Sequence, residues 1–135
     1  MASATETKDD RKYTKDHEWA LTQGDEILVG ITAFAVDQLG DVTLVGLDVK
    51  VGATVTAHQA FGTIESVKTL SDLFAPVSGV ITRVNQELEK QPELVNEDPW
   101  NKGWMIAIRP SKLAEEQGGL LDAAAYGAHL AASAH

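Results

Sequence analysis

One lysine stands out among the side chains that could take part in chemistry. Lys68 lies between two apolar-rich segments of nearly equal length, residues 60–64 and 70–74, and each has the composition of a β-strand. This arrangement predicts a β-hairpin with Lys68 at its tip, where the amine is exposed on a rigid base. Hairpin tips also carry lysines that serve only solubility, so the spacing alone leaves both interpretations open.

Signatures of the common catalytic sites are absent from the sequence. It contains no phosphate-binding loop, no glycine-rich dinucleotide motif after a strand, no serine nucleophile elbow and no zinc-binding histidine pair. The lack of cysteine excludes disulfides, thiolate zinc sites, iron–sulfur clusters and cysteine nucleophiles. The four histidines show no ligand spacing, so we expect no metal site. The sequence therefore predicts a protein that performs no catalysis of its own.

Length and charge narrow the class of protein. The chain has 135 residues, which is the length of one domain, and its content of 44% apolar and 23% charged residues is ordinary for globular proteins. A formal net charge of −9 opposes binding to phosphate backbones, so nucleic acid is not an expected partner. No apolar run is long enough to span a membrane, and the first residues resemble neither a signal peptide nor a transit peptide. We expect a cytoplasmic bacterial protein, or a mitochondrial matrix protein in its processed form.

Short strands separated by turn residues dominate the sequence. Gly24-Asp25 is a hairpin-like turn, and Thr32 and Gly40 are suited to cap the two ends of a short helix. The expected strands cover residues 18–23, 26–31, 41–48, 54–56, 60–67, 70–74, 80–85 and 104–108. The expected helices cover residues 33–39, 86–90, 112–117 and 120–132, and residues 91–101 form an irregular loop. This pattern predicts a mostly β fold, a compact barrel or sandwich with a short internal helix and a C-terminal helix.

The two ends of the chain differ from its middle. We expect a disordered polar tail over residues 1–10, followed by a single domain over residues 11–132. The C-terminal helix carries a narrow stripe of mostly small residues that is suited to lie closely on a sheet. The stripe consists of Leu120, Ala124, Gly127, Ala128 and Ala131.

Two glycines, one on either side of the predicted hairpin tip, are expected to serve the conformation or packing of the backbone. Gly62 lies within the strand before Lys68, and Gly79 follows Ser78. We expect each of them at a turn or at a close approach of two strands, and Gly79 in a turn with a positive φ angle.

Ordered pieces along nearly the whole chain match the pattern of one family. The pieces are Tyr13-Thr14, His17-Glu18-Trp19, Val29-Gly30-Ile31-Thr32, Gln38-Leu39-Gly40-Asp41, Glu65-Ser66-Val67-Lys68, Pro76-Val77-Ser78-Gly79, Val84-Asn85, Pro92-Glu93-Leu94-Val95-Asn96, Asp98-Pro99 and Gly103-Trp104. With them, residues 12–130 resemble the H-protein family of the glycine cleavage system, whose members carry lipoyl on a lysine. The order of so many pieces leaves little room for chance.

Related carrier domains differ at the residues beside the lysine. Biotinyl domains place it between two methionines, whereas Val67 and Thr69 flank Lys68. Lipoyl domains of 2-oxoacid dehydrogenases usually have an acidic residue directly before the lysine, whereas Glu65 stands three positions before Lys68. The hairpin therefore resembles the H-protein form.

The resemblance implies a barrel-sandwich hybrid fold of the lipoyl-domain type and a carrier function. Lys68 would form an amide with lipoic acid, and Glu65 would mark it for the lipoyl-attaching enzyme unless it is only a strand-edge charge. The other implied partners are the pyridoxal-phosphate-dependent glycine decarboxylase (P protein), the folate-dependent aminomethyltransferase (T protein) and dihydrolipoyl dehydrogenase (L protein). As a monomeric cosubstrate, the protein would carry the aminomethyl group of glycine from P protein to T protein and be reoxidised by L protein.

Two other functions remain compatible with the same hairpin. The protein could be a lipoyl reservoir or relay that supplies lipoyl groups to other 2-oxoacid dehydrogenase complexes. It could also be a non-lipoylated binding module, although the intact Lys68 and Glu65 argue against this.

A carrier of a water-labile group needs a shelter for its loaded arm. We expect apolar residues around Ile31, Phe34 and Leu39 to cover the tether. Glu18 would pair with the amine of the cargo, or it is an ordinary surface carboxylate.

Overall fold

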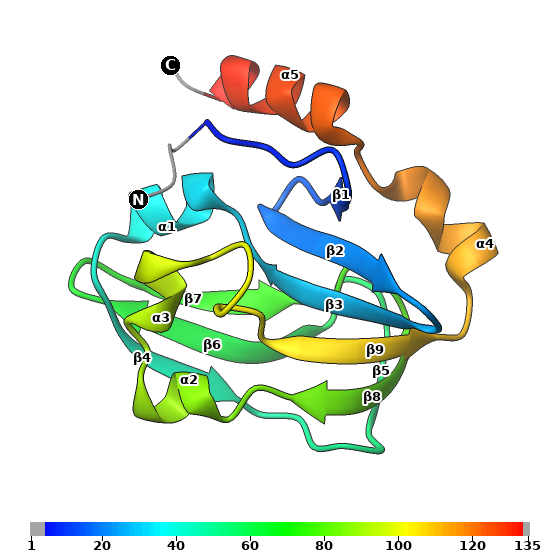
Figure 1. Cartoon of the computed structure of the whole chain (residues 1–135), viewed down its shortest axis with the longest axis horizontal. Helices are drawn as coiled ribbons and strands as arrows, with labels where there is room; N and C mark the ends of the chain where they lie inside the picture. The colour runs from blue at the N-terminus through cyan, green and yellow to red at the C-terminus, as the bar shows by residue number, and fades with distance from the viewer. Residues whose placement is uncertain (1–4, 134–135) are drawn as a thin grey trace.

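Two antiparallel sheets face each other in the computed structural model, which describes residues 5–133 (Figure 1). The six-stranded sheet has the order β1-β2-β3-β9-β8-β5, and the three-stranded sheet has the order β4-β6-β7. The strands of the first sheet are β1 Lys12–Tyr13, β2 Glu18–Gln23, β3 Glu26–Ile31, β9 Ile106–Pro110, β8 Gly79–Val84 and β5 Thr54–Val55. Those of the second are β4 Val42–Leu47, β6 Ala60–Ser66 and β7 Leu70–Phe74. The predicted fold class, mostly β with a C-terminal helix, is confirmed.

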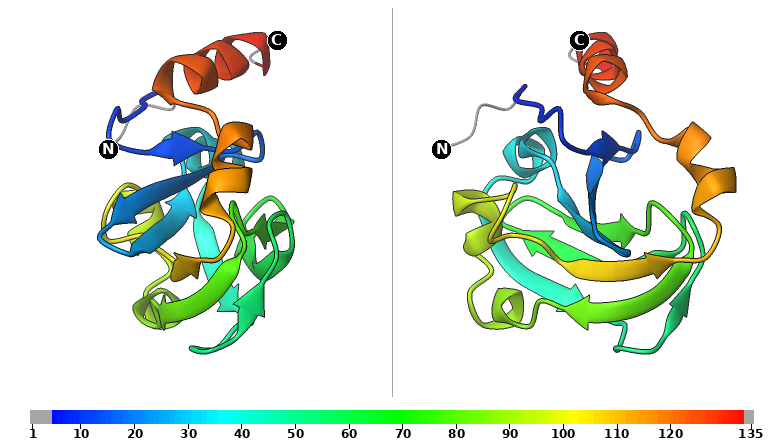
Figure 2. Two further views of the ribbon diagram at one scale, coloured as in Figure 1. Left: turned by 90° about the vertical axis from the view of Figure 1, so that its right-hand side faces the viewer. Right: turned by 45° about the vertical axis from the view of Figure 1, so that its right-hand side comes forward.

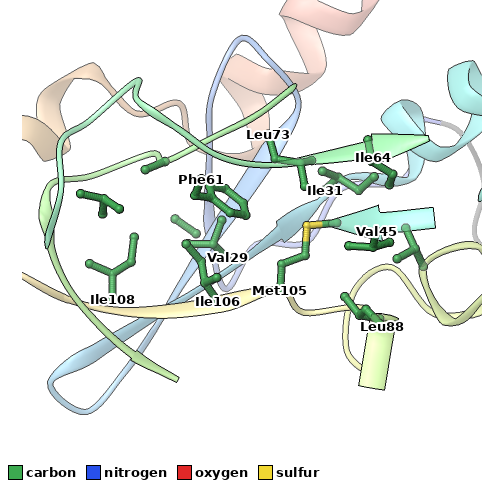
Figure 3. Packing of buried hydrophobic residues seen from close by; sticks show 14 of the residues in the cluster. Val29, Ile31, Val45, Phe61, Ile64, Leu73, Leu88, Met105, Ile106 and Ile108 are labelled. Atoms are coloured by element: carbon green, nitrogen blue, oxygen red, sulfur yellow. The ribbon is translucent and has the colours of Figure 1, made fainter. Parts of the chain in front are cut away.

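Apolar side chains from both sheets form one continuous core (Figure 3). Val29 and Ile106 come from the six-stranded sheet, Phe61 and Leu73 come from the three-stranded sheet, and all four are buried. Leu88, from the short helix α2 (Glu87–Lys90), belongs to the same cluster. Apolar side chains of the two sheets thus pack against each other, which is the packing of a sandwich.

Three short helices, α1 (Ala33–Leu39), α2 and α3 (Leu94–Glu97), lie at the end of the molecule where β6 turns into β7 (Figure 1). Helix α1 begins at Thr32, whose Oγ1 accepts a hydrogen bond from the Ala35 amide, and it ends at Gly40 with a φ of 77°, as predicted. The prediction of an irregular loop over residues 91–101 is wrong in part, because this segment contains helix α3. Val95 is completely buried in the core, and this burial stabilises a helix too short to persist alone.

The C-terminal segment forms α4 (Leu113–Glu116), the 3₁₀ helix η1 (Gln117–Gly119) and α5 (Ala123–Ser133). Figure 2 shows α5 above β1, away from the faces of the sheets. Its buried residues are Tyr126 and Leu130, while Ala124, Ala128 and Ala131 are exposed. The prediction that the small-residue stripe lies on a sheet is therefore wrong. Tyr126 stacks on Tyr13 with ring centroids 4.5 Å apart, so the large aromatic surface decides which face of α5 is buried.

Gly79 occupies the first position of β8 and not a turn with positive φ, so that prediction is wrong. A Cβ atom at Gly79 would lie 2.2 Å from the carbonyl oxygen of Arg109, and one at Gly62 would lie 2.3 Å from the carbonyl oxygen of Gly46. Both glycines therefore serve the close approach of neighbouring strands, which was the other expectation for them.

The described part of the predicted N-terminal tail contacts the domain. The Trp100 Nε1 donates to Glu6 Oε1 over 3.1 Å, and the Tyr13 hydroxyl donates to the Lys8 carbonyl oxygen over 2.7 Å. Residues 1–4 lie outside the described residues, and the division into tail and domain at residue 11 stays a prediction. Within residues 5–133, no helix has both the length and the apolar character needed to cross a membrane.

Candidate functional site

The β6–β7 hairpin presents Lys68 at its tip, as predicted. The strands remain paired up to Glu65 and Leu70, and the chain then turns through residues 66–69. The Ser66 amide donates to the Thr69 carbonyl oxygen over 2.8 Å. The Ser66 hydroxyl accepts from the amides of Lys68 and Thr69, each over 3.2 Å. One buried serine side chain therefore fixes the backbone at Lys68.

The side chain of Lys68 is exposed and lies beside the end of α1. Its Cε atom is 3.3 Å from the place that a Cβ would occupy at Gly40, whose φ of 77° also favours glycine. Within the described part of the chain, the Lys68 amine has neither an ion-pair partner nor a hydrogen-bond acceptor. The aliphatic part of the Lys68 side chain thus lies against Gly40, while the Nζ atom has no partner among the described residues.

A side chain distant in sequence holds the turn that supports this hairpin. The Asn96 Nδ2 donates to the Gly40 carbonyl oxygen, and the Asn96 Oδ1 accepts from the Val42 amide, both over 2.9 Å. Between these two residues, the Asp41 carbonyl oxygen accepts from the Val67 amide over 3.1 Å. Asn96 on α3 thereby connects through the Gly40–Val42 turn to the residue that precedes Lys68.

We expect Asn96→Ala to loosen the hairpin tip while the rest of the sheet stays protected. The change removes two hydrogen bonds worth about 1 kcal/mol each, so amide exchange at Val67 should accelerate by about tenfold or more relative to the amides of β9. Asn85→Ala is the matched control, because the Asn85 Nδ2 also donates to two carbonyl oxygens, those of Lys102 and Trp104. Equal acceleration at Val67 in both variants would show that Asn96 does not act on the tip specifically.

A groove lies beside the base of the hairpin, between α1 and the three-stranded sheet. It has a volume of about 370 Å³, and Ile31, Phe34 and Leu39 line it together with Glu18 and Ile64. The four residues that we predicted for a shelter are therefore brought together in one place. A larger hollow, of about 630 Å³, lies between His58 and Glu116, and no residue of the hairpin lines it.

Glu18 is buried in the wall of this groove, so its interpretation as a surface carboxylate is wrong. Only 2% of the residue is exposed. The Thr14 hydroxyl donates to Glu18 Oε1 over 2.7 Å, and the Phe74 amide lies 3.5 Å from Oε2. Burial raises the pKa of Glu18 to about 8, because these two donors do not replace the lost hydration of a carboxylate. The side chain is therefore mainly protonated at neutral pH.

This raised pKa predicts a loss of stability as pH rises. Between pH 4.5 and about pH 8, Glu18 is mainly protonated in the folded protein and mainly ionised in the unfolded chain. The free energy of unfolding should therefore fall as the pH rises across this range. The limiting slope for one such group is about 1.4 kcal/mol per pH unit. His17 opposes this trend up to pH 6.5, because burial lowers its pKa. Denaturant unfolding of the parent and of Glu18→Gln over this pH range isolates the Glu18 contribution, and parallel curves would contradict the prediction.

The two residues predicted for the site, Lys68 and Glu65, both lie on the β6–β7 hairpin. Lys68 lies at the hairpin tip, and Glu65 is exposed on β6 one pair below the turn. The site predicted from the sequence alone includes neither Ser66 nor Asn96. A serine at the first position of a four-residue turn is a recognisable signal for Ser66. Asn96 offered no such signal, because its partners lie 54 and 56 positions away.

The fold and the site define a small β carrier domain that presents one free lysine on a rigid hairpin. The chain belongs to the glycine cleavage H-protein family, whose model matches residues 11–133. Proteins of this family are lipoylated on a lysine, and this chain is a carrier protein and not a catalyst.

Named relatives agree with this assignment along most of the chain. The glycine cleavage system H protein of Thermus thermophilus is 52% identical over 117 residues, which cover 87% of this chain and 90% of the relative. That of Geobacillus kaustophilus is 48% identical over 109 residues, which cover 81% of this chain and 85% of the relative. The crystal structure of a glycine cleavage system H protein from Mycobacterium marinum is similar with a TM-score of 0.81 and 38% identity, and it covers 96% of this chain and 100% of that one.

Proposed function

We propose that Lys68 is the lysine that carries lipoyl, in an amide between its Nζ and the lipoyl carboxyl. The observation that supports this most directly is the free Lys68 amine on a turn fixed by Ser66 and by the Gly40–Val42 segment. The open surroundings of the tip fit a long, flexible group, since no described side chain covers the amine. Glu65, one pair below the turn, is a recognition residue for the lipoyl-attaching enzyme in this proposal.

In the proposed function, the protein serves the glycine cleavage system as a monomeric shuttle in the bacterial cytoplasm. It takes the aminomethyl group of glycine from P protein, delivers it to T protein and is reoxidised by L protein. Lipoyl, when bound, supplies a dithiol/disulfide pair on a tether, and the tether gives the cargo a high effective concentration at each partner. Membership of the family and the names of the relatives support this scheme.

The groove beside the hairpin is the proposed shelter for the loaded arm. Ile31, Phe34 and Leu39 exclude water from the tether, and Glu18 receives the amine of the cargo. A cationic amine beside Glu18 favours the charged carboxylate and opposes the effect of burial on its pKa. Glu18 would therefore release its proton as the amine arrives, so the buried acid is converted into an ion-pair partner.

Reconstitution with purified P, T and L proteins tests this function. The lipoylated protein should support glycine-dependent release of ammonia and one-carbon transfer to the folate. In the absence of T protein, the loaded native protein should release ammonia from its aminomethyl group more slowly than the same protein after heat unfolding, since unfolding removes the groove. Identical release rates would contradict the shelter. Transfer of lipoyl to a 2-oxoacid dehydrogenase without support of glycine cleavage would favour the relay function instead.

A further inference from the structure

A row of exposed side chains crosses the outer face of the three-stranded sheet directly below the hairpin tip. Leu44 on β4 pairs with Glu65 on β6, and Glu65 pairs with Leu70 on β7. Residues directly opposite one another in a sheet project from the same face, so Glu65 lies between the two leucines. Leu44 is 50% exposed and Leu70 is 62% exposed, although neighbouring Val45 and Ile64 project into the core.

A third apolar side chain continues this surface to the modified position. Val67 precedes Lys68 in the turn and is 66% exposed. Together, Leu44, Leu70 and Val67 form what we term the apolar collar of the hairpin. Exposed apolar residues are usual when scattered, but three of the four large ones in the described part of the chain gather around Lys68. The fourth, Val51, lies in the connection between β4 and β5.

We propose that the apolar collar, with Glu65 at its centre, is the docking surface for the lipoyl-attaching enzyme. This inference rests on the proposed modification of Lys68 and extends it from one carboxylate to an apolar interface. The enzyme would cover Leu44 and Leu70 with apolar side chains and place a cationic side chain opposite Glu65.

The length of the lysine side chain favours this enzyme over the enzymes of glycine cleavage. During attachment, the Lys68 Nζ attacks an activated lipoyl carboxyl, the amide C–N bond forms, and the activating group leaves while the amine loses a proton. The attaching enzyme must therefore bring its own active site to the end of a lysine side chain, and it has to contact the residues around the tip. The P, T and L proteins act at the far end of the longer lipoylated arm and do not need this contact.

The charge at the centre of the collar supports a complementary partner. Glu65 has no ion pair among the described residues, and no donor is seen on its carboxylate. A cation that meets this carboxylate inside an apolar rim is shielded from water, so its effect on binding exceeds that of an exposed ion pair. The described surface thus offers an unpaired anion between two leucines, which is a more specific target than charge alone.

Binding of the unlipoylated protein to a purified lipoate–protein ligase tests the collar directly. Leu44→Ser with Leu70→Ser should raise the dissociation constant by about tenfold or more, since apolar residues at the centre of an interface carry much of its affinity. Val51→Ser is the matched control, because Val51 is also 66% exposed but lies outside the hairpin. It should leave the dissociation constant unchanged. After a timed reaction with the ligase, lipoate and ATP, intact mass should show a smaller lipoylated fraction for the collar variant than for the parent and the Val51→Ser control.

Three outcomes separate the inference from the proposed function. Equal dissociation constants for the collar variant and the Val51 control would overturn the collar as a docking surface. Normal binding to the ligase with impaired binding to P, T or L protein would assign the surface to another partner and would also overturn it. Attachment of lipoyl at a lysine other than Lys68 would instead contradict the proposed function itself. Unfolding midpoints of the variants, which should equal that of the parent at these exposed positions, exclude a folding defect.

Discussion

Lys68→Arg should abolish lipoylation while the protein remains folded. Arginine preserves a long stem against Gly40 and a positive charge at the tip, but its guanidinium does not form the amide that a lysine amine forms. Because Lys68 is exposed, the change should alter the free energy of unfolding by no more than about 0.5 kcal/mol. Intact mass after coexpression with a lipoate ligase should show the unmodified protein alone. The same variant should be inactive in the reconstituted glycine cleavage system.

Lys50→Arg is the appropriate control for this experiment. Lys50 is also exposed, and it lies in the connection between β4 and β5, away from the hairpin. This variant should be lipoylated to the same extent as the parent, with the modified peptide containing Lys68. Lipoylation that survives in Lys68→Arg would show that another lysine is accepted, and the assignment of the site would then be wrong.

Gly79→Val should have the largest effect on stability of the substitutions considered. Two of the atoms that the new Cβ would meet are the Arg109 carbonyl oxygen at 2.2 Å and the Ile108 Cγ2 at 2.7 Å. These atoms belong to β9, which pairs with β8, so relief of the overlap requires that two central strands separate. We expect a loss of about 3 kcal/mol or more in the free energy of unfolding. Lys68→Ala, by comparison, should cost no more than about 0.5 kcal/mol.

A glycine in open space provides the control for this steric explanation. A Cβ at Gly118, in η1, would meet no atom within 4 Å, and its φ angle is not positive. Gly118→Val should therefore shift the denaturant midpoint only slightly, although it introduces the same side chain. If Gly79→Val and Gly118→Val have the same midpoint, the close approach of β8 and β9 does not require glycine.

Some parts of the candidate site could be predicted from residues that are close together in the sequence, and others could not. The hairpin around Lys68 was predictable because two apolar-rich segments of similar length flank this lysine, and the β6–β7 pairing confirms it. The capped helix at residues 33–39 was predictable for the same reason, since Thr32 and Gly40 act on their own neighbours. Helix α3 was missed, because its stability comes from the burial of Val95 in a core that the local sequence does not reveal.

The sequence by itself determined the family to which the chain belongs and the two strands that carry Lys68, the proposed site of lipoylation. The hairpin depends on residue types at short spacing, and the family depends on the order of short motifs along the chain, so both can be recognised without knowledge of tertiary contacts. The tertiary structure alone decided that Asn96 supports the tip, that Glu18 is buried and mainly protonated, and that Tyr126 selects the packed face of α5. Each of these depends on a partner many residues away, and neither hydrophobic period nor turn chemistry specifies which distant group a side chain will meet.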